Sequence, residues 1–160
     1  MASSLRIKCI SGSLFEVPGV LVHQTNCSST RVAGLASNVF SHYPCANTYI
    51  NWHSKRKLGC CDVFDVRSYG TPVEYVVNMN AQTFPGKPNA RENHLMRQQK
   101  FSECLLELQG LVATHKWKRV NFPYRIGCGL AGGNWDMYLE MIQRFAESVD
   151  IDVYIVMPNN

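Results

Sequence analysis

Two loop-like segments hold the residues whose types and spacing are suited to binding a charged ligand. The later one reads RIGCGLAGGNW over residues 125–135 and joins a strand-like segment to a helix-like one through four glycines. Glycine adopts positive φ angles without steric cost, so successive N–H groups can turn towards an anion that also meets the positive end of the next helix. We call residues 125–134 the glycine loop and interpret it as a phosphate-binding loop.

The earlier segment is a hydrophobic strand that ends in polar groups. Residues 21–27 read LVHQTNC, and residues 28–36 continue as SSTRVAGLA. We call residues 26–33 the asparagine loop; small hydroxyl side chains there precede a helix expected near Gly34, a second arrangement suited to an anion. On neighbouring parallel strands the two loops face each other across one sheet edge. The cleft between them is long enough for a diphosphate with a sugar at either end.

The spacing of Gly127, Gly129 and Gly132 also satisfies the G-x-G-x-x-G pattern of dinucleotide-binding folds, with Asp152 twenty residues beyond. That fold needs a second mononucleotide-binding half, and only 28 residues follow Gly132. A nicotinamide- or flavin-dependent oxidoreductase is therefore a remote alternative.

Length and composition indicate one domain over residues 1–160, with 46% hydrophobic residues spread along the chain. No run of 18 apolar residues predicts a membrane span, and the first six residues lack the apolar core of a secretory signal. Seven cysteines without a CxxC pair favour a reducing compartment, the cytoplasm or nucleus. The chain is compatible with a free-standing protein or with a domain of a longer one, a viral polyprotein included, for which the compartment is the host cytoplasm.

The formal net charge of +4 is spread over the chain, and the only tight basic cluster is Lys55-Arg56-Lys57. We interpret this cluster as the solvated C-terminal turn of a helix, favoured by the helix dipole. A mildly positive surface attracts a phosphorylated small molecule; nucleic acid is not the expected partner, although the charge does not exclude it. The histidines and cysteines show no metal-ligand spacing, so we expect neither a metal nor a cofactor.

Hydrophobic periodicity predicts alternating strands and helices, with the last strand wholly apolar as in a sheet buried on both faces. The fold class expected is α/β: a three-layer α/β/α sandwich around a mixed, mostly parallel sheet of about six strands. The expected strands are 5–10, 19–24, 62–67, 74–80, 119–123 and 152–157, and the expected helices are 33–42, 46–57, 91–114 and about 138–149.

These segments resemble the macro domain family, whose members bind ADP-ribose. The strand ending in His23, Gln24, Thr25 and Asn26 is similar to the family's Asn-Ala-Ala-Asn strand end, and GCGLAGG over residues 127–133 is similar to its diphosphate loop. The resemblance spans nearly the whole chain. The subclass most similar in appearance includes the terminal ADP-ribose protein glycohydrolase and, more loosely, the yeast-type ADP-ribose-1''-phosphate phosphatase.

The resemblance places His23 and Asn26 beside the distal ribose as the catalytic candidates. A neutral imidazole can orient a water or accept its proton near pH 7, and an asparagine amide can hold the 2'' or 3'' hydroxyl. Phe84, in a Pro- and Gly-rich segment, is the candidate lid over adenine or ribose. The other ADP-ribose contacts implied are Ser13, Leu14, Thr25, Ala33, Gly34, Leu35, Ile126, Gly127, Cys128, Gly129, Leu130 and Ala131.

The chain also departs from the family. Ser13 stands where macro domains commonly have an acid that binds the adenine amino group, so weaker adenine selectivity is expected. The glycohydrolase uses a lysine and an aspartate where this chain has Asn80-Ala81-Gln82 and Ala131. Without an amine nucleophile and its carboxylate partner, a lysine-dependent covalent route is not expected.

Three functional hypotheses follow. The first is a hydrolase acting at C1'' of the distal ribose, which removes the phosphate of ADP-ribose-1''-phosphate or releases ADP-ribose from modified proteins. The second is a non-catalytic module that binds ADP-ribose or ADP-ribosylated proteins, and the third is the dinucleotide oxidoreductase. The sequence indicates no oligomeric state.

Overall fold

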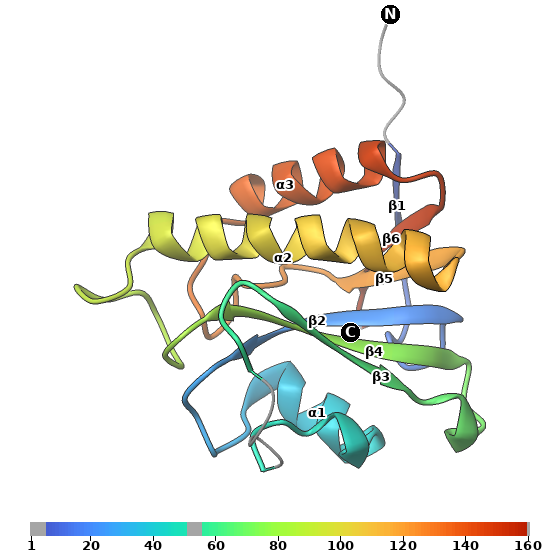
Figure 1. The fold of residues 1–160 in the computed structure, drawn as a ribbon, viewed down its shortest axis with the longest axis horizontal. Coiled ribbons are helices and arrows are strands. Elements are labelled where there is room, and N and C mark those ends of the chain that lie inside the picture. The colour runs from blue at the N-terminus through green and yellow to red at the C-terminus, as the bar shows by residue number, and fades with distance from the viewer. Residues whose placement is uncertain (1–5, 51–55, 160) are drawn as a thin grey trace, which may run out of the picture.

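A six-stranded sheet forms the centre of the described structure, a computed structural model that covers residues 6–50 and 56–159. The strand order is β1-β6-β5-β2-β4-β3 (Figure 1). All neighbours are parallel except β3, which pairs antiparallel with β4 at one edge. The strands are β1 Ile7–Ser11, β2 Gly19–Asn26, β3 Cys61–Asp65, β4 Val73–Gln82, β5 Arg119–Pro123 and β6 Asp152–Met157.

Helices cover both faces of this sheet. Helices α2 (His94–His115) and α3 (Trp135–Ser148) lie side by side on one face, and α1 (Gly34–His42) lies on the other (Figure 1). The three-layer sandwich with a mixed, mostly parallel sheet is therefore confirmed. Among residues 6–50 and 56–159, none of the helices combines the length and apolar composition that crossing a membrane requires.

The central strand β2 supplies side chains to the hydrophobic cores on both faces. Val20 and Val22 pack with the residues of α2 and α3, whereas Leu21 between them packs with those of α1. All three side chains are buried. This alternation is what a strand imposes on consecutive side chains, and it explains why the buried strands read as continuous apolar runs.

The helix expected over residues 46–57 is absent from the described part of that range. A short 3-10 helix, Pro44–Ala46, replaces its start, and residues 48–50 form a turn. The Asn47 side chain accepts hydrogen bonds from the backbone N–H groups of Tyr49 and Ile50. Such local side-chain bonds compete with helix formation. Residues 51–55 of the expected helix lie outside the described residues.

Helix α2 begins at His94 rather than at residue 91 because Asn93 is its N-cap, with a side chain that accepts a hydrogen bond from the Met96 N–H over 2.9 Å. Glu92, just before the cap, is part of a buried ion pair. Arg97 Nε donates to Glu92 Oε1 over 3.1 Å, and the two side chains are 1% and 4% exposed. Burial opposes ionisation of Glu92, but hydrogen bonds from the Thr83 and Phe84 N–H groups and from Arg97 outweigh it and lower the Glu92 pKa. Its ionisation therefore stabilises the fold above the ordinary pKa of 4.5, and this contribution is lost as the pH falls through the lower folded-state pKa.

Replacing Arg97 with Met should destabilise the protein strongly, because it leaves the Glu92 carboxylate buried without its partner. The expected loss in free energy of unfolding is about 3–5 kcal/mol, measured by urea denaturation near neutral pH. Arg144→Met is the control, since it breaks an exposed ion pair with Glu140 on α3 and should cost less than about 1 kcal/mol. Equal losses in the two variants would contradict the structural role of the buried pair.

Candidate functional site

Three loops meet at the carboxyl edge of the sheet because the strands that precede them are neighbours. Strand β2 lies between β5 and β4 and runs parallel to both. The asparagine loop follows β2, residues 83–93 follow β4, and the glycine loop follows β5. This edge is where parallel α/β sheets bind ligands.

A cavity of about 580 Å³ lies between these loops, within the range of about 300–1,000 Å³ typical of small-molecule sites. The asparagine and glycine loops both line it, as predicted. They also approach each other closely, since a Cβ added to Gly34 would lie 3.1 Å from Leu130 Cδ1. The predicted site residues that line the cavity are His23, Thr25, Asn26, Ala33, Gly34, Leu35, Ile126, Gly127, Gly129, Leu130 and Ala131.

The structure does not bring Ser13 and Leu14 to this cavity. Ser13 Oγ accepts a hydrogen bond from the backbone N–H of Phe15 over 3.2 Å, so it stabilises its own turn. Leu14 is buried in the core on the α1 side of the sheet. Both residues lie beyond β1, which is separated from β2 by β6 and β5.

Cys128 and Phe84 also do not line the cavity. The Cys128 thiol is buried and donates to the Ile126 carbonyl; burial raises the pKa of Cys128 to about 11, so it stays a thiol at neutral pH. The Phe84 ring lies under the Arg91 guanidinium, 4.7 Å from the ring centroid. Its neighbours Pro85 and Gly86 line the cavity in its place.

Asn26 organises the loop that bears its name. Its side-chain Oδ1 accepts hydrogen bonds from the backbone N–H groups of Ser28 and Ser29, at 3.2 and 2.8 Å. Its Nδ2 donates to the Tyr49 hydroxyl over 3.1 Å. These bonds fix which atom of the amide is oxygen and which is nitrogen. An amide nitrogen has two protons, and the second has no acceptor among the described residues.

Arg56 is a buried part of this loop rather than the solvated helix end that was expected. Its guanidinium donates to the carbonyl oxygens of Asn26 and Ser29, at 3.0 and 2.7 Å for Nη2. It also lies 4.6 Å from the centroid of the Tyr49 ring. The expectation failed because these acceptors are about thirty residues away in sequence. Lys55, in the same basic cluster, lies outside the described residues.

The amino end of helix α1 is open towards the cavity. Its N-cap residue, Ala33, has no side-chain acceptor, so the N–H groups of the first turn have no partner within the helix. Those N–H groups belong to Gly34, Leu35 and Ala36, which line the cavity. Free N–H groups at the positive end of a helix dipole are suited to binding an anion.

The glycine loop adds a second set of free N–H groups. Its internal turns use the amides of Cys128, Gly132 and Gly133, which donate to carbonyls of the same loop. The N–H groups of the consecutive residues 129–131 have no acceptor among the described residues, and all three residues line the cavity. A concave row of unpaired backbone N–H groups binds anions.

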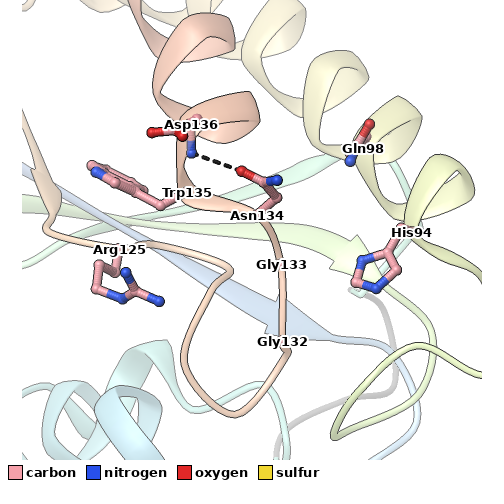
Figure 2. A pocket seen from close by; sticks show the side chains of 8 residues that line it. All are labelled: His94, Gln98, Arg125, Gly132, Gly133, Asn134, Trp135 and Asp136. Carbon is pink, nitrogen blue, oxygen red and sulfur yellow. Dashed lines mark hydrogen bonds between the residues drawn. The ribbon is translucent and has the colours of Figure 1, made fainter.

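Helix α3, which follows the glycine loop, does not contribute as predicted. The Asn134 side chain accepts hydrogen bonds from the N–H groups of Asp136 and Met137, so the amino end of α3 is already capped. A second hollow of about 630 Å³ lies there. Figure 2 shows Arg125 and Trp135 on one side of the glycine loop and His94 and Gln98 on the other. Because the N–H groups of Asp136 and Met137 are already paired, this hollow offers fewer free helix amides than the cavity.

His23 is a buried neutral imidazole at the base of the site. Asn78 Nδ2 donates to the Ala46 carbonyl, which turns Asn78 Oδ1 towards His23 Nε2, 2.6 Å away. Nε2 therefore carries the proton, and Nδ1 is a buried lone pair without a partner among the described residues. Burial lowers the pKa of His23 to about 4 against the opposing effect of Asn78. The unfolded chain takes up this proton near pH 6.5, so the fold loses stability as the pH falls from there to about 4.

The electrostatics of the cavity favour an anion. Arg31 and Arg125 line it, and none of the described lining residues is an aspartate, glutamate or lysine. The similar glycohydrolase has a lysine and an aspartate in the regions of Gln82 and Ala131. In this chain both lining residues are uncharged. In the described ranges, no group of three or more His, Cys, Asp or Glu residues is placed to hold a metal ion.

Sequence reasoning missed several residues of the cavity wall. Arg31 lies in the asparagine loop and Arg125 in the glycine loop. Their positive charge, in loops predicted to bind an anion, could have marked them as cavity residues. Gln24 and Gln82, at the ends of neighbouring strands, are hydrogen-bonded to each other, and Gln24 Oε1 remains a buried unpaired acceptor. Tyr49 had no local signal, because only the folded chain brings it to Asn26.

Comparison with known proteins supports the fold. No protein-family model matches the sequence. An uncharacterized 17.5 kDa protein of the tk-vs intergenic region of Enterobacteria phage T4 is 27% identical over 152 residues, covering 91% of this chain and 93% of the phage protein.

Solved macrodomain structures superpose over nearly the whole chain. The macrodomain of Mycobacterium tuberculosis DarG has a TM-score of 0.75 at 19% identity and covers 96% of this chain and 97% of its own. Thermosipho africanus DarTG in complex with ADP-ribose has a TM-score of 0.75 at 16% identity, covering 94% of this chain and 42% of its own. The Oceanobacillus iheyensis macrodomain with ADP has a TM-score of 0.65 at 15% identity, covering 93% and 81%. The chain has the macrodomain fold.

Two glycines of the glycine loop should respond differently to alanine. A Cβ on Gly127, at φ 75°, would lie 2.6 Å from Tyr138 Cε2 and 2.8 Å from Gln24 Oε1, whereas a Cβ on Gly129 meets no atom within 4 Å. Gly127→Ala should cost about 1–3 kcal/mol of unfolding free energy, and Gly129→Ala less than about 0.5 kcal/mol. Thermal denaturation of both variants checks this. A similar loss in Gly129→Ala would show that the loop is packed differently.

Proposed function

We propose that the chain binds ADP-ribose, free or attached to another molecule, in the cavity between the asparagine and glycine loops. The observation that carries the proposal is the pair of unpaired N–H sets, one at the start of α1 and one over residues 129–131, which face the same cavity. A diphosphate needs donors on more than one side, and the two sets supply them.

The groups beside these donors suit the sugars of such a ligand. Gln24 Oε1 and His23 Nδ1 are buried acceptors without partners among the described residues, and Asn26 Nδ2 keeps a free proton. Hydroxyl groups donate and accept, so a ribose can pair with both kinds. Arg31 and Arg125 add positive charge at the cavity wall. The chain also shares its fold with two solved structures that contain ADP-ribose or ADP, and this likeness supports the proposal that it binds ADP-ribose.

Hydrolysis at C1'' of the distal ribose is the second candidate, favoured by the bare Nδ1 of His23. With a pKa of about 4 this imidazole is a weak base at neutral pH, and its role would be to orient a water by accepting a hydrogen bond. The water oxygen would bond to C1'' while the bond from C1'' to the departing oxygen breaks; the phosphate or carboxylate would leave as an anion and the proton would pass to solvent. The alternative is a module that binds without turnover.

Calorimetry with ADP-ribose should show binding at one site, and Gly129→Val should weaken it at least tenfold. An added Cβ at residue 129 meets no atom within 4 Å in the free protein, and the valine side chain would fill space beside the free N–H groups of residues 129–131. Gly110→Val, in the middle of α2 and also without a neighbour within 4 Å of an added Cβ, is the control and should leave affinity unchanged. No heat at millimolar ADP-ribose would refute the proposed function.

Turnover should be tested with ADP-ribose-1''-phosphate and with a glutamate-ADP-ribosylated protein. If the domain is a hydrolase, Asn26→Asp should lower the rate about 100-fold, because it removes the amide protons but keeps an acceptor for Ser28 and Ser29. Thermal denaturation confirms that the variant folds. If neither substrate loses its group while ADP-ribose still binds, the non-catalytic module is the correct reading.

A further inference from the structure

Tyr49 lies in the cavity wall next to Asn26, although no sequence motif points to it. Tyr49 is 4% exposed. In the chain it comes shortly after the 3-10 helix Pro44–Ala46. The Asn47 side chain, which accepts from the Tyr49 N–H over 3.1 Å, holds the local turn. Tyr49 packs with the core residues on the α1 side of the sheet and lines the cavity.

The hydrogen bonds around the Tyr49 hydroxyl leave its proton unused. The backbone N–H of Asn26 donates to the hydroxyl oxygen over 3.0 Å, and Asn26 Nδ2 donates to it over 3.1 Å. The amide cannot be reversed, because its oxygen already accepts from Ser28 and Ser29. A hydroxyl that accepts two hydrogen bonds still has one O–H to donate. That proton has no acceptor among residues 6–50 and 56–159.

The ring that carries this hydroxyl is held on two sides. The Arg56 guanidinium lies over it at 4.6 Å from the ring centroid, and Phe40 of α1 makes an edge contact with ring centroids 5.2 Å apart. Burial raises the pKa of Tyr49 despite the opposing effects of Asn26 and Arg56, so the hydroxyl keeps its proton at neutral pH. The ring is therefore held in place, and its hydroxyl is a donor at neutral pH.

We propose that the Tyr49 hydroxyl and the free Nδ2 proton of Asn26 form a pair of donors that binds two neighbouring hydroxyl oxygens of the ligand's distal sugar. The inference rests on the proposed function, since it assumes that the asparagine loop contacts the distal ribose of ADP-ribose. It makes Tyr49 a specificity-determining residue. A ligand that ends at the diphosphate lacks these ribose hydroxyls, whereas ADP-ribose has them.

The test compares ADP-ribose with ADP, which lacks the distal ribose, by calorimetry on three proteins: wild type, Tyr49→Phe and Tyr43→Phe. Tyr43 is the matched control, because it is a buried tyrosine whose hydroxyl is hydrogen-bonded to Thr71 Oγ1 at 2.7 Å, away from the cavity. Each variant loses one buried hydroxyl and keeps its ring, so a moderately lowered melting temperature is expected in both.

The expected result is that Tyr49→Phe weakens ADP-ribose about three- to tenfold, as for one neutral hydrogen bond, and leaves ADP unchanged. Tyr43→Phe should change neither affinity. Equal weakening of ADP-ribose and ADP by Tyr49→Phe would overturn the inference, because Tyr49 would then act only by holding the asparagine loop. Unchanged ADP-ribose affinity would overturn it as well. If wild type binds no ADP-ribose, the proposed function fails first and the inference fails with it.

Discussion

The ion pair between Glu92 and Arg97 is the contact on which the shape of the cavity depends. Arg97 also donates to the carbonyl oxygens of Gly86 and Ala131, one on each side of the cavity, at 2.6 and 3.1 Å. Glu92 accepts from the backbone N–H of Thr83 over 2.6 Å. The loop after β4 has few backbone bonds of its own, so these two side chains satisfy its polar groups and join it to the glycine loop. Burying two charged side chains costs free energy because both lose their hydration. The hydrogen bonds that Glu92 and Arg97 make with the two loops offset this cost only when the loops are held in this arrangement.

The fold could be predicted because its signals are local. The apolar runs of β2 and β6 and the helical spacing of Tyr138, Ile142 and Phe145 are visible without knowing what packs against them. The position of the site could also be predicted, since loops after neighbouring parallel strands must meet at one edge. The start of α2 was open to prediction as well, since Asn93 before His94 is an N-cap residue.

The details of the site depended on contacts that are distant in sequence. Arg56 looks like a surface cation until Asn26 and Ser29 are placed beside it, and Tyr49 looks like a helical residue until its hydroxyl meets Asn26. The role of Asn134 was open to prediction, since asparagine before a helix is a common N-cap. Of the two helix starts that were predicted to face an anion, only that of α1 stays uncapped, because Ala33 has no group to cap with.

The donors that face the cavity are mainly peptide N–H groups, and this has a consequence for how much the sequence can vary. Every residue except proline supplies the same backbone donor, so most side chains around the cavity are free to change while the donors stay in place. What selection must preserve is the path of the chain: the positive φ at Gly34 and Gly127, and the strand order behind them. One fold can therefore be reached by very different sequences, as it is here and in the Mycobacterium tuberculosis DarG macrodomain, with a TM-score of 0.75 at 19% identity.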